Sequence, residues 1–138
     1  MKRAPELMPL SREHHEALVL AKRACTGTDR AAVRRQVLRG WSQQMQAHIE
    51  IEELVLLPAM IQAGAGSACA YALQQHEQLR TYADLLRAGD LEALPLWGDA
   101  MREHVQFEER SLFALAQELV DLSRLAQELV RPTPAAAA

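Results

Sequence analysis

A pattern of metal-binding residue types occurs twice in this sequence. It reads Trp-x3-Met-x2-His-x3-Glu-Glu-x2-Leu, and its second copy begins 56 residues after the first. In each copy the first Glu follows the His by four residues, which is about one helical turn. The two copies contain both tryptophans of the chain. Their members are Trp41, Met45, His48, Glu52, Glu53 and Leu56 in the first copy and Trp97, Met101, His104, Glu108, Glu109 and Leu112 in the second.

The spacing of this pattern predicts a His and a Glu inside a helical core. On a helix the Trp, Met, His, first Glu and Leu share one stripe, and the other members of that stripe are apolar. A buried carboxylate costs free energy unless it is paired or binds a metal. A shared pair of cations therefore explains two such His–Glu pairs meeting across a bundle. Imidazole with carboxylate suits iron, manganese or zinc, and the lack of thiolate ligands in the pattern argues against an iron–sulfur cluster.

The alternative to a metal site is a set of ordinary polar contacts. A single His–Glu pair one turn apart is more often a surface hydrogen bond than a pair of ligands. Here the pair recurs in register with apolar partners, and each of the other two predicted helices also contains histidine. This recurrence favours metal binding over a plain helical interaction module without metal.

The first and third predicted helices supply the remaining histidines. His14 continues an apolar stripe, whereas His15 lies about 100° further round the helix. Residues 15–18 nevertheless echo residues 76–79, so His14 is favoured and His15 remains the alternative. His76 is the only histidine of its helix. The apolar neighbours behind these assignments are Leu10, Leu18, Ala21 and Cys25 around His14, and Leu73, Leu79 and Ala83 around His76.

The elements that must position these residues are predicted to be helices. Ala, Leu, Glu, Gln and Arg dominate the composition, and these residues favour helix. Helical periodicity with breaks at Gly and Pro predicts four helices, at about residues 10–25, 29–61, 67–88 and 95–120. Short connections predict an all-α fold, an up-down-up-down antiparallel four-helix bundle with a short C-terminal extra helical segment. Ser11, Asp29 and Ser67 are the expected caps, and Pro58 is expected to kink or terminate the second helix.

The bulk properties predict one domain over residues 1–138, with residues 1–9 and 132–138 flexible. The net charge of −3 gives no indication of nucleic-acid binding. No apolar stretch approaches the ~18 residues of a membrane span, and no secretory signal is evident. Cys25 and Cys69 are expected to be free, buried thiols of a cytoplasmic protein.

The combined motifs resemble the hemerythrin-like, or HHE cation-binding, family over roughly Leu10 to Leu119. The strongest pieces are H-x3-E-E-x3-L-P at His48 to Pro58 and the second H-x3-E-E at His104 to Glu109. The resemblance implies two iron ions joined by an oxo or hydroxo bridge, with manganese or zinc as other possible metals. The ligands it implies are His14 (or His15), His48, Glu52, His76, His104 and Glu108, with Glu52 and Glu108 bridging the metals.

The sequence departs from the oxygen-carrying members at one ligand. These proteins have a second His one turn after the third-helix His, and here that position is Arg80. The departure leaves a coordination position to water, an exogenous ligand or another carboxylate. The sequence is therefore more similar to the branch of the family tied to iron or redox sensing than to an oxygen carrier. Helix four also has Ala114 where the family often repeats the proline.

Residues around the predicted ligands are expected to support them. Several glutamates are candidate acceptors for the imidazole N–H groups that face away from the metal, although most are expected to be solvated. Bulky apolar residues of the repeat are expected to restrict water, or to be ordinary core. The glutamates are Glu13, Glu50, Glu53, Glu77 and Glu109, and the apolar residues are Trp41, Met45, Trp97 and Met101.

These residues lead to three functional hypotheses. The first is a non-haem di-iron protein that binds or senses oxygen, nitric oxide, peroxide or iron itself, with a small diatomic or peroxide ligand at iron. The second is a di-iron, peroxidase-like enzyme, which is less favoured because no dedicated acid–base residue is evident. The third is the metal-free interaction module. A sensor would require a separate protein partner, and the oligomeric state is left open.

Overall fold

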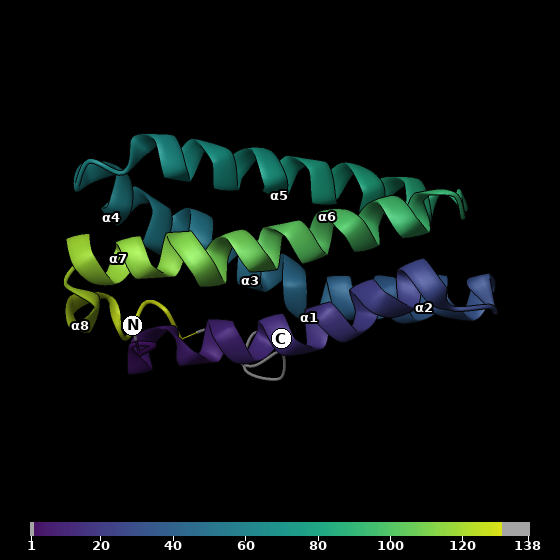
Figure 1. The fold of residues 1–138 in the computed structure, drawn as a ribbon, viewed down its shortest axis with the longest axis horizontal. Coiled ribbons are helices and arrows are strands. Elements are labelled where there is room, and N and C mark those ends of the chain that lie inside the picture. Colours follow the sequence, from purple (N-terminus) through teal and green to yellow (C-terminus); the bar gives the residue numbers. More distant parts are fainter. Residues whose placement is uncertain (1, 131–138) are drawn as a thin grey trace.

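The computed structural model describes residues 2–130, and in that part of the chain all regular structure is helical. Four long helical segments lie alongside one another, and the chain reverses direction at each of the three connections between them (Figure 1). A short helix follows near the end of the described chain, at the same end of the molecule as residue 2. The predicted all-α class is confirmed.

Each long segment is either one helix or a continuous series of helical pieces. The first is the 3₁₀ helix η1 (Pro5–Leu7) followed by α1 (Met8–Thr26). The second is α2 (Arg30–Gly40), the π-helix η2 (Trp41–Met45), α3 (Gln46–Ile51), the π-helix η3 (Glu52–Leu56) and α4 (Leu57–Gln62). The third is α5 (Gly66–Arg87). The fourth is α6 (Ala93–Phe107), the π-helix η4 (Glu108–Leu112) and α7 (Phe113–Leu119), after which comes the short α8 (Leu122–Leu125).

Glycines end two of the long segments where the sequence predicted breaks. Gly64 and Gly89 have φ angles of 100° and 94°, a left-handed conformation that glycine adopts without steric cost. The N–H after each glycine returns to a carbonyl five residues back, from Ala65 to Met60 at 2.9 Å and from Asp90 to Leu85 at 3.0 Å. This pattern satisfies the last carbonyls of both helices.

The predicted helix starts are right at one position and wrong at two. The Asp29 carboxylate accepts a hydrogen bond from the Ala32 N–H at 3.1 Å and caps α2. Ser11 lies inside α1 because that helix already begins at Met8, and Ser67 lies one residue inside α5, which has no side-chain cap. The second segment continues past Pro58 to Gln62.

Residues 1–9 were expected to be flexible, and those of them that the structure describes, from residue 2 onward, pack against the bundle. Leu7 is fully buried, and the Ala4 N–H donates to Gln117 Oε1 at 2.8 Å. Residues 132–138, the other segment expected to be flexible, lie outside the described residues. No helix among residues 2–130 is long and apolar enough to span a membrane.

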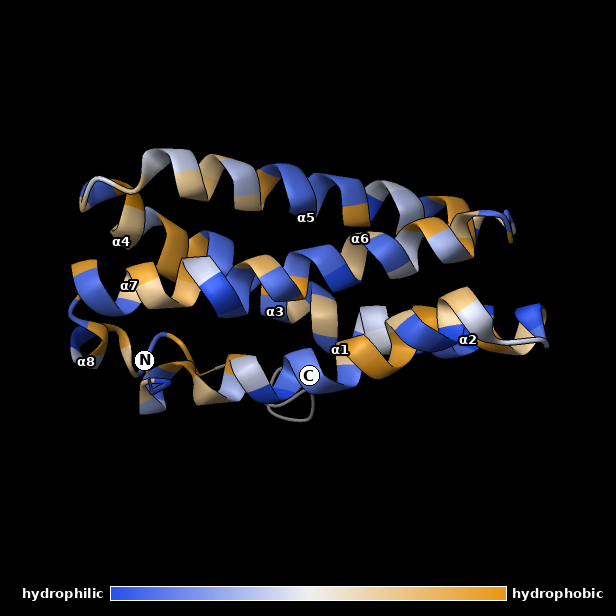
Figure 2. Ribbon diagram, viewed as in Figure 1, coloured by the Kyte–Doolittle hydropathy of each residue, from blue (hydrophilic) through white to orange (hydrophobic). Residues whose placement is uncertain are grey.

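The apolar core is divided into two clusters along the bundle. Polar and apolar residues interleave along every long segment (Figure 2). One cluster lies towards the α1–α2 connection and includes Ala17, Trp41, Met45, Ile49, Leu79, Trp97, Met101 and Val105. The other lies towards the N-terminus and α8 and includes Leu7, Leu10, Leu56, Cys69, Ala72, Leu112, Phe113 and Leu122. The four Trp and Met residues of the repeat are thus core residues, all at most 1% exposed.

The buried face of α1 differs by a small rotation from the predicted stripe. Ala17 and Ala24 are buried, whereas Leu18 is 36% exposed and Cys25 is exposed. The prediction that both cysteines are buried is therefore right for Cys69 and wrong for Cys25. The observed stripe follows spacings of four and three residues from Leu10, through His14, Ala17, Ala21 and Ala24. Small alanines suit it because α1 packs closely on α6.

Candidate metal centre

Six polar side chains form one buried layer between the two apolar clusters. Each of the four long segments contributes at least one of them. The layer contains His14 of α1, His48 of α3, Glu52 of η3, His76 of α5, His104 of α6 and Glu108 of η4. His14 is 2% exposed and the other five are 0% exposed. The six residues predicted from the sequence are therefore brought together, whereas the alternative His15 is exposed.

These side chains form two groups of four that share both carboxylates. The first half is His14, His48, Glu52 and Glu108, and the second half is His76, His104, Glu52 and Glu108. Within each half, one ligand atom from each residue lies within 4.8 Å of all the others. Two ligands on opposite sides of a metal ion, each about 2.1 Å from it, are about 4.2 Å apart. Each half therefore has the dimensions of a single cation site.

The imidazole Nε2 atoms of both halves face the shared carboxylates. The shortest separations are His14 Nε2 to Glu108 Oε1 at 2.8 Å, His48 Nε2 to Glu52 Oε2 at 3.1 Å, His76 Nε2 to Glu52 Oε1 at 3.0 Å and His104 Nε2 to Glu108 Oε2 at 3.3 Å. Each glutamate thus directs one oxygen to the first half and the other to the second. This is the arrangement that a carboxylate bridging two cations requires.

The opposite nitrogen of every imidazole is held by an acceptor outside the layer. The Nδ1–H groups donate from His14 to Glu109 at 2.7 Å, from His48 to Glu13 at 3.0 Å, from His76 to Glu53 at 2.8 Å and from His104 to Gln75 at 2.8 Å. A carboxylate or amide oxygen can only accept, so the proton is on Nδ1. In the neutral imidazoles each Nε2 then points a lone pair into the layer. Metal-binding histidines are usually oriented in this way.

The two consecutive glutamates of each repeat contact the two ring nitrogens of a single histidine. Glu52 contacts His76 at Nε2 and Glu53 contacts it at Nδ1. Both glutamates belong to η3, and the corresponding pair at the start of η4 contacts His14 in the same manner. Single-turn π-helical segments are frequent at functional sites. Here they place two adjacent carboxylates around one imidazole ring.

The residues around the ligands were predicted only in part. Glu13, Glu53 and Glu109 act as acceptors, although most such glutamates were expected to be solvated. Glu50 and Glu77 are exposed, as expected of surface glutamates.

Gln75 was missed by the sequence reasoning. A signal for it exists, because Gln75 lies three residues after Ala72 and four before Leu79, on the buried stripe of α5. A glutamine on a buried stripe requires a polar partner.

Electrostatics distinguish the four histidines when the layer holds no cation. Burial opposes protonation of all four, but Glu52 and Glu108 outweigh it at His48 and His76 and raise the pKa of each to about 10. Hydrogen bonds to Glu108 and Glu109 likewise raise the pKa of His14. At His104 burial wins and lowers the pKa to about 4. The nearby histidines hold the pKa of Glu108 well below its usual range despite its burial.

The donor set fits a pair of metal ions. Among the described residues, His104 Nε2 and Glu108 Oε2 are buried atoms of the layer without any hydrogen-bond partner. A buried polar atom left unpaired is costly, and a cation between these two ligand atoms would satisfy both. Imidazole nitrogen and carboxylate oxygen are ligands for iron, manganese and zinc. The chain therefore presents a His/Glu cluster compatible with metal binding.

Comparison with known proteins agrees with this geometry. The model of the hemerythrin HHE cation binding domain family matches residues 9–116. No curated protein and no solved structure matched the chain. The family match includes all six residues of the buried layer and covers more than half of the sequence. The chain therefore belongs to the hemerythrin HHE cation binding domain family.

Proposed function

We propose that this protein holds two iron ions in the buried layer and uses them to bind or sense oxygen or another small redox species. One observation carries the proposal. Glu52 and Glu108 each direct one carboxylate oxygen to the first half and the other to the second half. A single cation would need only one half. Two neighbouring cations give both oxygens of both buried carboxylates a partner.

The chain contributes charge compensation, orientation and exclusion of water. Two carboxylates at 0% exposure lower the cost of bringing cations into an apolar core. The outer hydrogen bonds fix each imidazole with its Nε2 lone pair inward. The antiparallel bundle places an apolar cluster on each side of the layer. When bound, two irons would supply reversible electron transfer and a coordination position for a small diatomic or peroxide ligand.

Arg80 supports a sensing or binding role rather than stable oxygen carriage. It stands one turn after His76, and its guanidinium donates to both oxygens of Glu53, at 2.7 and 3.0 Å, and to Glu77 at 2.9 Å. A guanidinium has no lone pair to offer a metal. The described chain therefore supplies four imidazoles and two carboxylates to two cations, which leaves coordination positions for exogenous ligands. A sensor of this type would signal to a separate protein partner.

Metal content and the visible spectrum of protein from iron-replete cells test the proposal. We expect about two irons per chain and charge-transfer bands that bleach on anaerobic reduction. The double variant Glu52→Gln with Glu108→Gln should lose the iron and the bands. The matched control is Glu50→Gln, which alters an exposed glutamate of the same segment and should retain both.

The same preparation separates the competing functions. Spectral changes of the reduced protein with oxygen or nitric oxide, without turnover, support binding or sensing. Sustained peroxide consumption that the double variant abolishes would instead indicate an enzyme. Wild-type protein without metal, with stability unchanged in the double variant, would overturn the proposal in favour of a helical interaction module.

A further inference from the structure

We propose that Gln75 makes the two metal positions unequal, so that the second half of the centre is the more easily reduced. Gln75 acts as a positioning residue, through its hydrogen bond to His104, and would not touch a cation itself. This inference rests on the proposed function, because it concerns how the chain tunes the metals that the buried layer would hold.

The two halves follow the same plan, and Gln75 is the outer acceptor that differs in charge from its counterpart. Glu13 precedes His14 on α1 and accepts the Nδ1–H of His48 on the second segment, at 3.0 Å. Gln75 precedes His76 on α5 and accepts the Nδ1–H of His104 on the fourth segment, at 2.8 Å. Each acceptor therefore directly precedes one histidine of the layer in the sequence and binds another histidine on the next long segment. One is a carboxylate and the other is a neutral amide.

The difference between carboxylate and amide reaches the metal through the imidazole. A carboxylate at the outer N–H makes an imidazole a stronger electron donor, because it favours partial transfer of the proton. An amide oxygen does this more weakly. A weaker donor stabilises the higher oxidation state of a metal less, so the metal is reduced more readily. His104 is the only one of the four imidazoles whose described outer partner is uncharged.

The other histidine of the second half adds to the asymmetry. His76 donates to Glu53, but the Arg80 guanidinium occupies both oxygens of that carboxylate and draws on its charge. In the first half, the Glu109 carboxylate accepts from the Ser11 hydroxyl at 2.8 Å. The Arg3 guanidinium donates to the main-chain oxygen of Glu109 at 2.6 Å and lies 3.4 Å from its carboxylate. Glu53 therefore passes less negative charge to His76 than Glu109 passes to His14.

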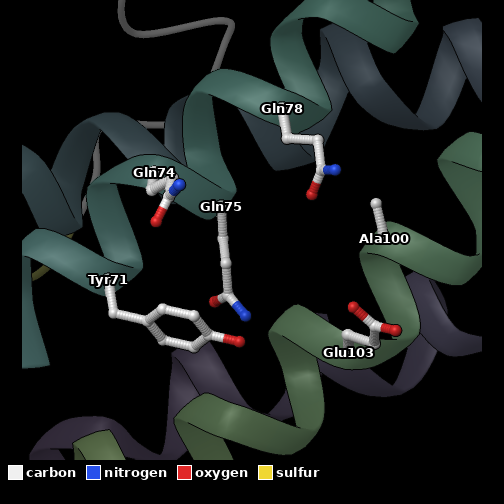
Figure 3. A pocket seen from close by; sticks show the side chains of 6 residues that line it. All are labelled: Tyr71, Gln74, Gln75, Gln78, Ala100 and Glu103. Carbon is white, nitrogen blue, oxygen red and sulfur yellow. The ribbon is translucent and has the colours of Figure 1, made fainter.

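Gln75 is open to experiment because it lines a surface pocket. The pocket lies between α5 and α6, has a volume of about 300 Å³ and is also lined by Tyr71, Gln74, Gln78, Ala100 and Glu103 (Figure 3). The Gln75 amide extends from α5 into this space towards α6 (Figure 3). Only 7% of the residue is exposed, yet water in the pocket can solvate a charge placed there. Gln75→Glu is nearly isosteric, so it changes the charge without a change of shape.

The test is the reduction potential of the iron-loaded protein, followed through its visible bands at pH 8. We expect Gln75→Glu to act on the first reduction step, which belongs to the more easily reduced second half. At a given potential, the reduced-to-oxidised ratio of that step should move about tenfold towards the oxidised form, which is about 59 mV for one electron. The control is Gln74→Glu, which adds the same charge to the same pocket from an exposed position. The control should leave the potentials unchanged.

A second variant tests the hydrogen bond rather than the charge. Gln75→Leu removes the acceptor for His104, and loss of such an outer partner typically weakens metal binding 10–100-fold. Retention of iron against a chelator measures this loss, and thermal unfolding of the metal-free variant confirms that it folds. Gln74→Leu is the matched control and should retain iron like the wild type.

The outcomes separate this inference from the proposed function. A shift in Gln75→Glu that is absent in Gln74→Glu supports the inference. If the wild type binds iron and Gln75→Glu has the same reduction potentials as Gln74→Glu, the inference is overturned and the proposed function stands. Wild-type protein without iron overturns the proposed function and the inference together.

Discussion

The first and second halves of the buried layer share two glutamates but differ in what surrounds their histidines. In the first half the outer acceptors are the carboxylates of Glu13 and Glu109. In the second half they are the amide of Gln75 and a carboxylate that Arg80 already engages. The inner candidate ligands are alike, so under the proposed function the outer partners are what can give two neighbouring cations different properties.

The two halves also differ in the protons they take up when no cation is bound. Both histidines of the first half have a raised pKa. In the second half the pKa of His76 is raised and that of His104 is lowered. His104 Nε2 and Glu108 Oε2 are buried without a hydrogen-bond partner, and both face the second half. In the metal-free protein, protons can therefore pair the buried nitrogen and oxygen atoms of the first half more completely than those of the second half.

The largest effect is expected from a shared glutamate. Glu108→Gln should abolish binding in both halves, because Glu108 supplies one oxygen to each. It should also destabilise the metal-free protein by roughly 3–5 kcal/mol, since it leaves buried imidazoliums without their partner. Iron content and urea unfolding measure the two effects. Glu118→Gln, at an exposed position of α7, is the control. One iron retained per chain would contradict the sharing of Glu108.

A terminal histidine is expected to affect mainly its own half. His14→Gln should reduce the iron content from about two to about one per chain, because His14 contributes only to the first half. His15→Gln changes the neighbouring exposed histidine and should leave the iron content at the wild-type value. Metal analysis of both purified variants decides the point. An equal loss of iron in the two variants would indicate that His15 also binds metal and would contradict the assignment of the first half.

The pH dependence of the metal-free protein should reveal the unequal protonation. His48 has a pKa of about 10, above its usual value of 6.5, so its contribution to stability is complete below pH 6.5 and disappears as the pH rises to about 10. His104 has a pKa of about 4, so its burial costs stability below pH 6.5 and this cost fades as the pH rises from 4 to 6.5.

Unfolding free energies between pH 4 and 10 test both directions. We expect a fall of a few kcal/mol above pH 6.5, because one unit of pKa shift corresponds to about 1.4 kcal/mol. His48→Gln should reduce that fall without removing it, because His14 and His76 also have a raised pKa. His104→Gln should change only the acid side. Identical profiles for the two variants would contradict the opposite pKa shifts of His48 and His104.

The smallest effect is expected from making the outer partners equal. Glu13→Gln gives His48 an amide acceptor like the one His104 has in Gln75. The two metal positions should then become more similar, with the potential of the first half rising and the separation between the two reduction steps narrowing. Spectroscopic redox titration measures this separation. Glu16→Gln, at an exposed position of α1, is the control and should preserve the wild-type separation.

The six candidate ligands were predictable because their burial depends on local periodicity. A repeated His-x3-Glu on an apolar stripe can face only the core, whatever the details of packing. The same reasoning placed His76 on the buried side of its helix and favoured His14 over His15, and the structure brings both into the layer. The helix ends at Gly64 and Gly89 were predictable for an equally local reason, since both glycines adopt left-handed φ angles.

The outer partners could not be predicted because they depend on how helices are rotated and aligned. Ser11 was expected to cap a helix, but α1 begins earlier and the Ser11 hydroxyl binds Glu109, 98 residues further along the chain. The small rotation of α1 that exposes Cys25 has the same origin, because close packing on α6 favours the alanine face over the stripe of larger residues.

The sequence by itself determined the helical class and the two His–Glu pairs, because helical periodicity links residue spacing directly to burial. Only the tertiary structure decided that Glu52 and Glu108 each serve both halves, and that Glu13 and Gln75 occupy equivalent places beside His48 and His104. The His48–Glu52 and His104–Glu108 pairs are local. The other contacts join residues that are separated by 24 to 94 positions in the sequence. Their geometry depends on the register between helices, which no local pattern encodes.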